Sequence, residues 1–115
     1  GDDFEEQFRE TGQDYSVTHK MEDILPELDV IYMNSITIAG EAYRSMGEDF
    51  KLSRDSNLKD SAVILHPLAR LDELDTSLDD TPHNLYFSQA HGAVFVRQAL
   101  LISILDRLGK LPSQL

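Results

Sequence analysis

Short apolar runs alternate with segments of helical periodicity along this chain. The unbroken runs Val30–Met33 and Ala62–Leu65 are rich in β-branched and aromatic side chains, which is typical of buried strands. Residues 2–11 carry two phenylalanines four positions apart, acidic residues in the first turn and a following Gly12, and this combination predicts a helix. Two strands and one helix are therefore indicated by pattern alone.

Three other segments have weaker patterns. Apolar and polar residues alternate over 14–18, which predicts a short strand, and Met21–Glu27 is predicted to be a helix that Pro26 limits. Residues 40–50 have a helical spacing of apolar positions. The alternation of helix and strand predicts an α/β fold: a parallel, Rossmann-like sheet with helices on both faces. No strand precedes the first helix, so we expect this α/β domain to be incomplete.

The C-terminal third has a different organisation. Residues 66–83 have no periodicity and contain two prolines, which predicts a long loop of the kind that usually carries function. A short helix is predicted over 84–90 and a longer one over 93–108, the latter apolar on more than one side. We expect this last helix to pack on another domain or chain. The sequence thus divides into a partial α/β domain, residues 1–92, and a C-terminal helical segment, residues 93–115.

Composition narrows the classes of function. The chain has 115 residues, is 41% hydrophobic and carries a formal net charge of −11, which argues against nucleic acid or an anionic membrane as partner. It has no cysteine, which excludes disulfides and thiolate metal sites. Neither a signal peptide nor an apolar run of ~18 residues is found. We therefore expect a cytoplasmic protein.

The loop after the second strand carries the candidate chemistry. Loops at the carboxyl ends of parallel strands hold ligands in α/β folds. His66 could be a general base or hydrogen-bond donor, or it could close the strand end by bonding backbone, and the second alternative is the more common one. Arg70 could bind a phosphate or carboxylate, or could pair with one of the nearby acids at 72, 73 and 75. No metal-binding spacing surrounds His66, so no metal is expected.

The acidic pair Asp79-Asp80 offers a second candidate. Two adjacent carboxylates could serve as acid and base, but an aspartate before Pro82 more often caps a turn or a short helix. From the residues alone the prediction stops at an anion site at a strand end, in an incomplete α/β domain.

Four motifs in order carry a resemblance to a known family. Residues 62–105 resemble the C-terminal part of the aspartate carbamoyltransferase family, whose patterns read His-Pro-Leu-Pro-Arg, Asp-x-Thr-Pro-His, Tyr-Phe-x-Gln-Ala and Arg-x-Ala-Leu-Leu. The corresponding stretches here are Leu65–Leu74, Asp79–His83, Tyr86–Ala90 and Val96–Leu101, and Leu25–Met33 is also similar. Ornithine carbamoyltransferases differ, with a His-Cys-Leu-Pro pattern.

The resemblance implies a parallel α/β amino-acid-binding domain that closes over a separate N-terminal carbamoyl-phosphate domain, which is missing here. The implied reaction is carbamoyl transfer from carbamoyl phosphate to aspartate, in pyrimidine biosynthesis, without metal or organic cofactor. In the His66-Pro67-Leu68-Ala69-Arg70 loop, the backbone carbonyls of Leu68 and Ala69 would meet the carbamoyl group and Arg70 would support the loop. The C-terminal helix resembles the helix that crosses to the other domain, and the resemblance implies a homo-oligomer.

Two departures from the family pattern concern substrate binding. Ser35 stands where the family has an arginine that binds the aspartate side-chain carboxylate, and Thr37 stands where it has a glutamine. Serine cannot replace a charged, bidentate clamp. Ala69 replaces the second proline of the loop motif, which removes some rigidity. The alternatives are therefore a non-catalytic homologue kept for assembly or regulation, a carbamoyltransferase for a different amine, or an acidic module that binds small anions through Arg70. As an isolated chain it should not catalyse carbamoyl transfer.

Overall fold

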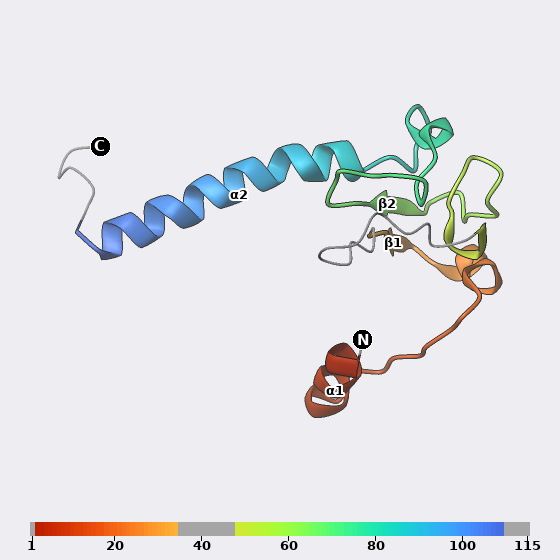
Figure 1. Cartoon of the computed structure of the whole chain (residues 1–115), viewed down its shortest axis with the longest axis horizontal. Helices are drawn as coiled ribbons and strands as arrows, with labels where there is room; N and C mark the ends of the chain where they lie inside the picture. Colours follow the sequence, from red (N-terminus) through yellow and green to blue (C-terminus); the bar gives the residue numbers. More distant parts are fainter. Residues whose placement is uncertain (1, 35–47, 110–115) are drawn as a thin grey trace.

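The computed structural model describes residues 2–34 and 48–109, and these form a small body with a helix extending from it at each end of the chain (Figure 1). At the N-terminus, α1 (Asp2–Thr11) is joined to the body by an extended segment, and at the C-terminus α2 (Tyr86–Arg107) runs outward. The principal extents are 55 × 38 × 35 Å. The body thus holds the sheet and the loops, and most of both helices lies outside it.

The sheet confirms the two predicted strands. β1 (Val30–Tyr32) and β2 (Val63–Leu65) pair in parallel, with Ile31 opposite Ile64. The backbone N–H of Ile64 donates to His83, and Leu85 donates back to Ile64, so the segment before α2 runs parallel along the free edge of β2. The α/β class with a parallel sheet is therefore confirmed.

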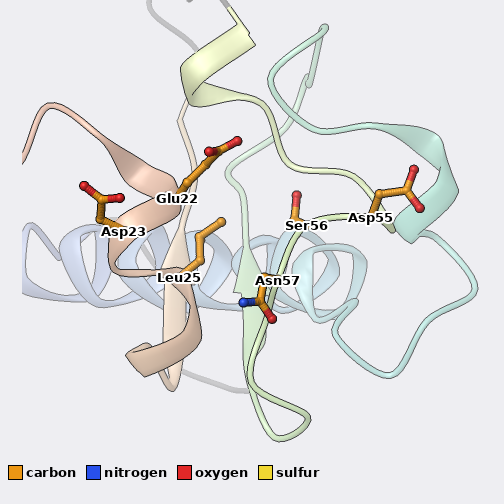
Figure 2. A pocket seen from close by; sticks show the side chains of 6 residues that line it. All are labelled: Glu22, Asp23, Leu25, Asp55, Ser56 and Asn57. Carbon is orange, nitrogen blue, oxygen red and sulfur yellow. The ribbon is translucent and has the colours of Figure 1, made fainter.

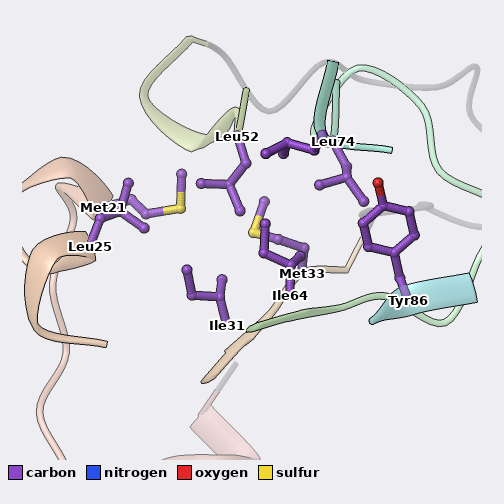
Figure 3. Close-up of a cluster of buried hydrophobic side chains, with 9 residues drawn as sticks. Met21, Leu25, Ile31, Met33, Leu52, Ile64, Leu74 and Tyr86 are labelled. Carbon is purple, nitrogen blue, oxygen red and sulfur yellow. The ribbon is translucent and has the colours of Figure 1, made fainter. Parts of the chain in front are cut away.

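One face of this sheet carries the core. Ile31 and Ile64 are buried among side chains from the turns and from the start of α2, as Figure 3 shows. The opposite face is less covered by the described residues, because Val30 and Tyr32 are 56% and 57% exposed. The buried cluster comprises Met21, Leu25, Ile31, Met33, Leu52, Ile64, Leu74, Leu78 and Tyr86.

Helix α1 ends as its sequence predicts. Gly12 has a φ of 67°, and Gln13 donates its N–H to the Phe8 carbonyl, so the chain leaves the helix through a left-handed residue. The predicted strand over 14–18 is wrong. Tyr15 instead stacks on Phe8 with ring centroids 5.5 Å apart, and the Nε–H of Arg9 donates to its hydroxyl. Aromatic packing on the preceding helix replaces strand pairing there.

Where the structure describes them, the helical segments predicted within the body are short 3₁₀ turns. The predicted helix Met21–Glu27 is two 3₁₀ turns, η1 (Met21–Asp23) and η2 (Leu25–Glu27), with Pro26 at the start of the second. Proline lacks an N–H, so an uninterrupted α-helical ladder cannot run through it. A further turn, η3 (Glu48–Phe50), is the only described part of the helix predicted over 40–50. The long loop is confirmed, with one turn, η4 (Thr76–Leu78), inside it.

The C-terminal region differs from the prediction in one respect. The structure has a single helix of 22 residues, α2, where two helices were predicted on either side of Gly92. A glycine inside a helix costs only about 1 kcal/mol relative to alanine, and the run Arg97–Leu101 further along consists of good helix formers. The boundary drawn between residues 92 and 93 therefore falls in the interior of α2.

Candidate functional site: the strand-end loop

The loop that follows β2 begins with a buried histidine. Side chains alternate across a strand, so Ala62, Ile64 and His66 all point to the core face, and they are at most 1% exposed. Pro67 and Ala69 lie on the surface and Leu68 is half-buried. The structure therefore places the predicted site residues 66–70 together at the carboxyl end of β2, with the histidine inside and the loop backbone outside.

His66 has a hydrogen-bond partner on each ring nitrogen and on its backbone N–H. Its Nδ1 accepts the backbone N–H of Leu68 at 2.9 Å, so its Nε2 carries the proton and donates to Oε1 of Glu73 at 2.8 Å. Its own backbone N–H donates to the side-chain carbonyl of Gln89, in α2, at 2.8 Å. Of the two alternatives for His66, the structure agrees with the one in which it bonds the backbone of the loop.

Glu73 is the second fully buried ionisable group of this loop. Its Oε1 also accepts the backbone N–H of Leu71 at 3.0 Å, while Oε2 is buried without a hydrogen-bond partner among the described residues. Burial works to raise the pKa of Glu73, but the N–H groups of Leu71 and His66 outweigh it, and the pKa lies below its usual value. Glu73 is thus held as a carboxylate that binds His66 at the start of the loop and Leu71 at its end.

The backbone between these anchors has an uncommon conformation. Leu68 has a φ of 53°, in the left-handed region that a leucine rarely adopts, and the Leu68–Ala69 peptide is cis. A non-glycine residue in the left-handed region persists only where its surroundings impose that conformation, and such residues cluster at functional sites. The hydrogen bond from Leu68 to His66 is one such constraint.

Arg70 makes the second connection of the loop. Its two terminal nitrogens donate to the two carboxylate oxygens of Asp79, with 2.6 Å between Nη2 and Oδ2, and the Tyr86 hydroxyl donates to Oδ1 of Asp79 at 2.6 Å. The guanidinium lies 5.5 Å from the Tyr86 ring centroid and 5.6 Å from that of Phe87. Arg70 therefore supports the loop against the start of α2. It pairs with an acidic residue, as one of the two alternatives had it, but that residue is Asp79 and not residue 72, 73 or 75.

This cluster shifts three pKa values. The Arg70 guanidinium lowers the pKa of Asp79 to about 2, and the carboxylate in turn raises that of Arg70. Burial, together with the hydrogen bond to Asp79, raises the pKa of Tyr86 to about 12. All three shifts favour the charge states seen in the cluster at neutral pH.

Folding stability should consequently depend on pH in two windows. Asp79 has a lower pKa when folded than when unfolded, so its contribution is present above pH 3.8 and is lost as the pH falls towards 2. Tyr86 has a higher pKa when folded, so its contribution is present below pH 10 and is lost as the pH rises towards 12. Since the Asp79 side chain is 34% exposed, we expect the acid loss to be on the order of 1–2 kcal/mol.

Urea denaturation across these pH ranges measures both losses. Asp79→Asn should reduce the acid loss by the contribution of Asp79, because no ionisable group remains at that position, while Glu73, whose pKa is also lowered, keeps its own contribution. Asp80→Asn is the matched control: this carboxylate is 80% exposed and pairs with Arg54, so its removal should leave the window unchanged. An equal effect of the two substitutions would contradict the assignment.

The two adjacent aspartates, Asp79 and Asp80, have different partners. Asp79 is held by Arg70 and Tyr86, whereas Asp80 pairs with Arg54 at the surface. The predicted capping role falls instead to Asp75, whose side chain accepts the N–H of Ser77 at the start of η4. The predicted pair of catalytic or capping aspartates thus separates into a loop anchor and a surface ion pair.

Sequence reasoning missed Glu73, Asp79 and Tyr86 as partners of the loop. Glu73 lies among several acids of the same segment, and nothing in one sequence distinguishes a buried carboxylate from exposed ones. Asp79 and Tyr86 are 9 and 16 residues from Arg70, a separation that only the fold brings together. Ser35 and Thr37, the other two predicted site residues, lie outside the described residues.

An acidic hollow of about 420 Å³ lies elsewhere on the body (Figure 2). Its lining includes the carboxylates of Glu22, Asp23 and Asp55 and none of the residues 66–70. Over residues 2–34 and 48–109, no group of three or more histidine or acidic side chains is arranged to hold a metal ion. The helices in these same ranges are not long and apolar enough to cross a membrane.

The geometry defines an α/β domain in which a loop follows the carboxyl end of a parallel strand, where ligands commonly bind in this fold class. Hydrogen bonds from His66 to Glu73 and from Arg70 to Asp79 hold this loop in place. Comparison with known proteins gives the family. The family description "Aspartate/ornithine carbamoyltransferase, Asp/Orn binding domain" matches residues 1–104, and the chain belongs to this family. The resemblance found in the four motifs is therefore confirmed.

Relatives and solved structures agree with this assignment. The chain is 39% identical over 111 residues to an aspartate carbamoyltransferase catalytic subunit of Aliivibrio fischeri, and 38% identical over 106 residues to that of Photobacterium profundum. Both matches cover 88% of this chain and 34% of the relative. The ligand-free aspartate transcarbamoylase of Trypanosoma cruzi has a TM-score of 0.68 and 27% identity, over 87% of this chain and 33% of that one.

The chain thus spans about a third of the length of the curated relatives it matches. The other two thirds of those relatives have no counterpart in these residues.

Proposed function

We propose that this chain is the amino-acid-binding part of a carbamoyltransferase that transfers the carbamoyl group of carbamoyl phosphate to the α-amino group of aspartate, in pyrimidine biosynthesis. The observation that carries the proposal is the supported loop 66–70, in a chain whose relatives are catalytic subunits of aspartate carbamoyltransferase. Assaying phosphate release from carbamoyl phosphate, with a longer protein that includes the carbamoyl-phosphate domain, tests it.

In this proposal the loop acts through its backbone. Carbonyl oxygens of Leu68 and Ala69 face the carbamoyl group, and they can stabilise its N–H groups without themselves gaining or losing a proton. His66 and Arg70 are occupied by Glu73 and Asp79, so their role is to hold the loop in place rather than to contact substrate. Such a site works by positioning and requires no cofactor.

Helix α2 supplies the second part of the proposal. Tyr86 is its one buried residue in the described structure, and its apolar side chains beyond Gly92 are exposed to solvent. We infer that this surface packs against the N-terminal carbamoyl-phosphate domain. The exposed apolar residues are Val94, Phe95, Val96, Leu100, Leu101, Ile102, Ile104, Leu105 and Leu108.

The 115-residue chain alone should consequently self-associate. Large exposed apolar patches drive association when their partner is absent, so sedimentation velocity should detect species larger than the monomer. Replacing both Leu101 and Leu105 with glutamate should return the chain to the monomer. Ser103→Glu is the matched control, because it adds a charge about 200° round the helix from Leu101 and should change little. A monomer with the native α2 would contradict the proposed docking.

A second candidate is a homologue that no longer transfers to aspartate. The observation that favours it is Ser35, which stands at the position of the family's carboxylate-binding arginine, with Thr37 at that of the glutamine. Such a protein would use a different amine or serve assembly or regulation. A homo-oligomeric state and a cytoplasmic location remain predictions under either candidate.

A further inference from the structure

We propose that Glu73 is the positioning residue of loop 66–70, and that it sets the direction of the loop's carbonyl groups by fixing the tautomer of His66. This inference rests on the proposed function and assigns a role to a residue that does not itself contact substrate. Glu73 and His66 are both completely buried, which makes their shared hydrogen bond independent of solvent.

The pair fixes the ring through proton placement. A neutral imidazole carries its proton on one nitrogen and accepts at the other. Because Glu73 is a carboxylate with a lowered pKa, it can only accept, and it therefore keeps the proton on Nε2 of His66. Nδ1 is then left as an acceptor, which is what the N–H of Leu68 requires.

The same pair fixes two peptide planes. In a trans peptide the N–H and the preceding carbonyl point in opposite directions. The N–H of Leu68 points inward to His66 and that of Leu71 points inward to Glu73, so the carbonyls of Pro67 and Arg70 point away from the buried pair. One carboxylate thus orients the peptide units on both sides of Leu68 and Ala69, and holds Leu68 in its left-handed conformation.

The alternative tautomer of His66 would break its hydrogen bond with Leu68. With the proton on Nδ1, the ring would present a donor to the N–H of Leu68, and the two would repel. Gln89 would still hold the His66 backbone, so the fold of β2 would survive while the loop beyond it changed. The function of Glu73 is therefore separable from simple stabilisation.

The first test is the tautomer itself in the 115-residue chain. Long-range ¹H–¹⁵N spectra of the imidazole should show Nε2 protonated and Nδ1 unprotonated for His66. A ring protonated on Nδ1 in the native chain would overturn the proposal, whatever the variants do. This readout needs no substrate, so it stands even if carbamoyl transfer is never observed.

Two substitutions at residue 73 then separate charge from hydrogen bonding. Glu73→Met has a similar size but no acceptor, and it should mix the tautomers. Glu73→Gln keeps an acceptor oxygen and should retain the native one. In the longer protein, Glu73→Met should lower kcat about 10- to 100-fold, because small misplacements of a positioned group have effects of this size, and Glu73→Gln should recover most of the loss.

Leu25→Ala is the control for lost stability. Leu25 is 2% exposed and lies in η2, away from the loop, so its truncation weakens the core without touching His66. Folded Leu25→Ala should keep both tautomer and kcat. The proposal is overturned if folded Glu73→Met keeps the native tautomer, or if it loses the tautomer and retains full kcat. An inactive native protein that shows the expected tautomer would count against the proposed function alone.

Discussion

Replacing Arg70 with alanine should destabilise the folded chain by about 2–4 kcal/mol. The substitution removes a bidentate partner from Asp79, and among the described residues the Tyr86 hydroxyl is then the remaining partner of that carboxylate. It also removes the cation that lies over the rings of Tyr86 and Phe87. Arg70 is 17% exposed, so solvent can replace only part of these contacts.

Arg54 provides a matched control for this prediction. It also pairs with an aspartate of the same acidic stretch, Asp80, but the two side chains are 56% and 80% exposed. Exposed pairs of this kind contribute about 0–1 kcal/mol, so Arg54→Ala should have a small effect in urea denaturation. Arg70→Lys should fall between the two, since lysine keeps the charge but lacks the planar fork. Equal losses for Arg70→Ala and Arg54→Ala would show that Arg70 does not anchor the loop.

The second large effect concerns Ser35 and Thr37. In the longer protein, Ser35→Arg combined with Thr37→Gln should raise aspartate turnover, because the pair restores the family's contacts to the substrate carboxylate. A charge-assisted contact of this type contributes roughly 2–5 kcal/mol, or about 30- to several-thousand-fold in kcat/KM. Both positions lie outside the described residues, so this prediction rests on the sequence resemblance.

Two controls define the outcome of this experiment. Ser35→Lys with Thr37→Gln supplies the charge without the bidentate geometry and should give a smaller gain. Turnover of other amino acids should not rise in parallel, since the restored contact is specific for the aspartate side chain. No increase with aspartate would place the carboxylate contact elsewhere in the protein.

Local patterns predicted the parts of this fold that depend on local physics. The runs at 30–33 and 62–65 became paired parallel strands because short, β-branched apolar segments are stable mainly when buried in a sheet. Gly12 ended α1 because it is free to adopt a positive φ. The carboxyl end of β2, where the candidate loop lies, followed from the order of the elements.

The errors came from contacts between distant residues and from weak local signals. Tyr15 was predicted in a strand, but it packs on Phe8. Gly92 was predicted to separate two helices, but α2 continues through it. Above all, the partners of His66 and Arg70 were not predictable from spacing, because Glu73 and Asp79 reach them through the folded path of the loop. The position of the loop at the end of β2 was thus predictable and its internal support was not.

Carbamoyl transfer by the longer protein is the decisive measurement for the proposed function. Phosphate release from carbamoyl phosphate should be measured with aspartate and with a series of other amino acids, beside the 115-residue chain as control. We expect release that requires an amino-acid acceptor and is absent from the isolated chain. A longer protein that carries an intact carbamoyl-phosphate domain and releases no phosphate with any amino acid would contradict it.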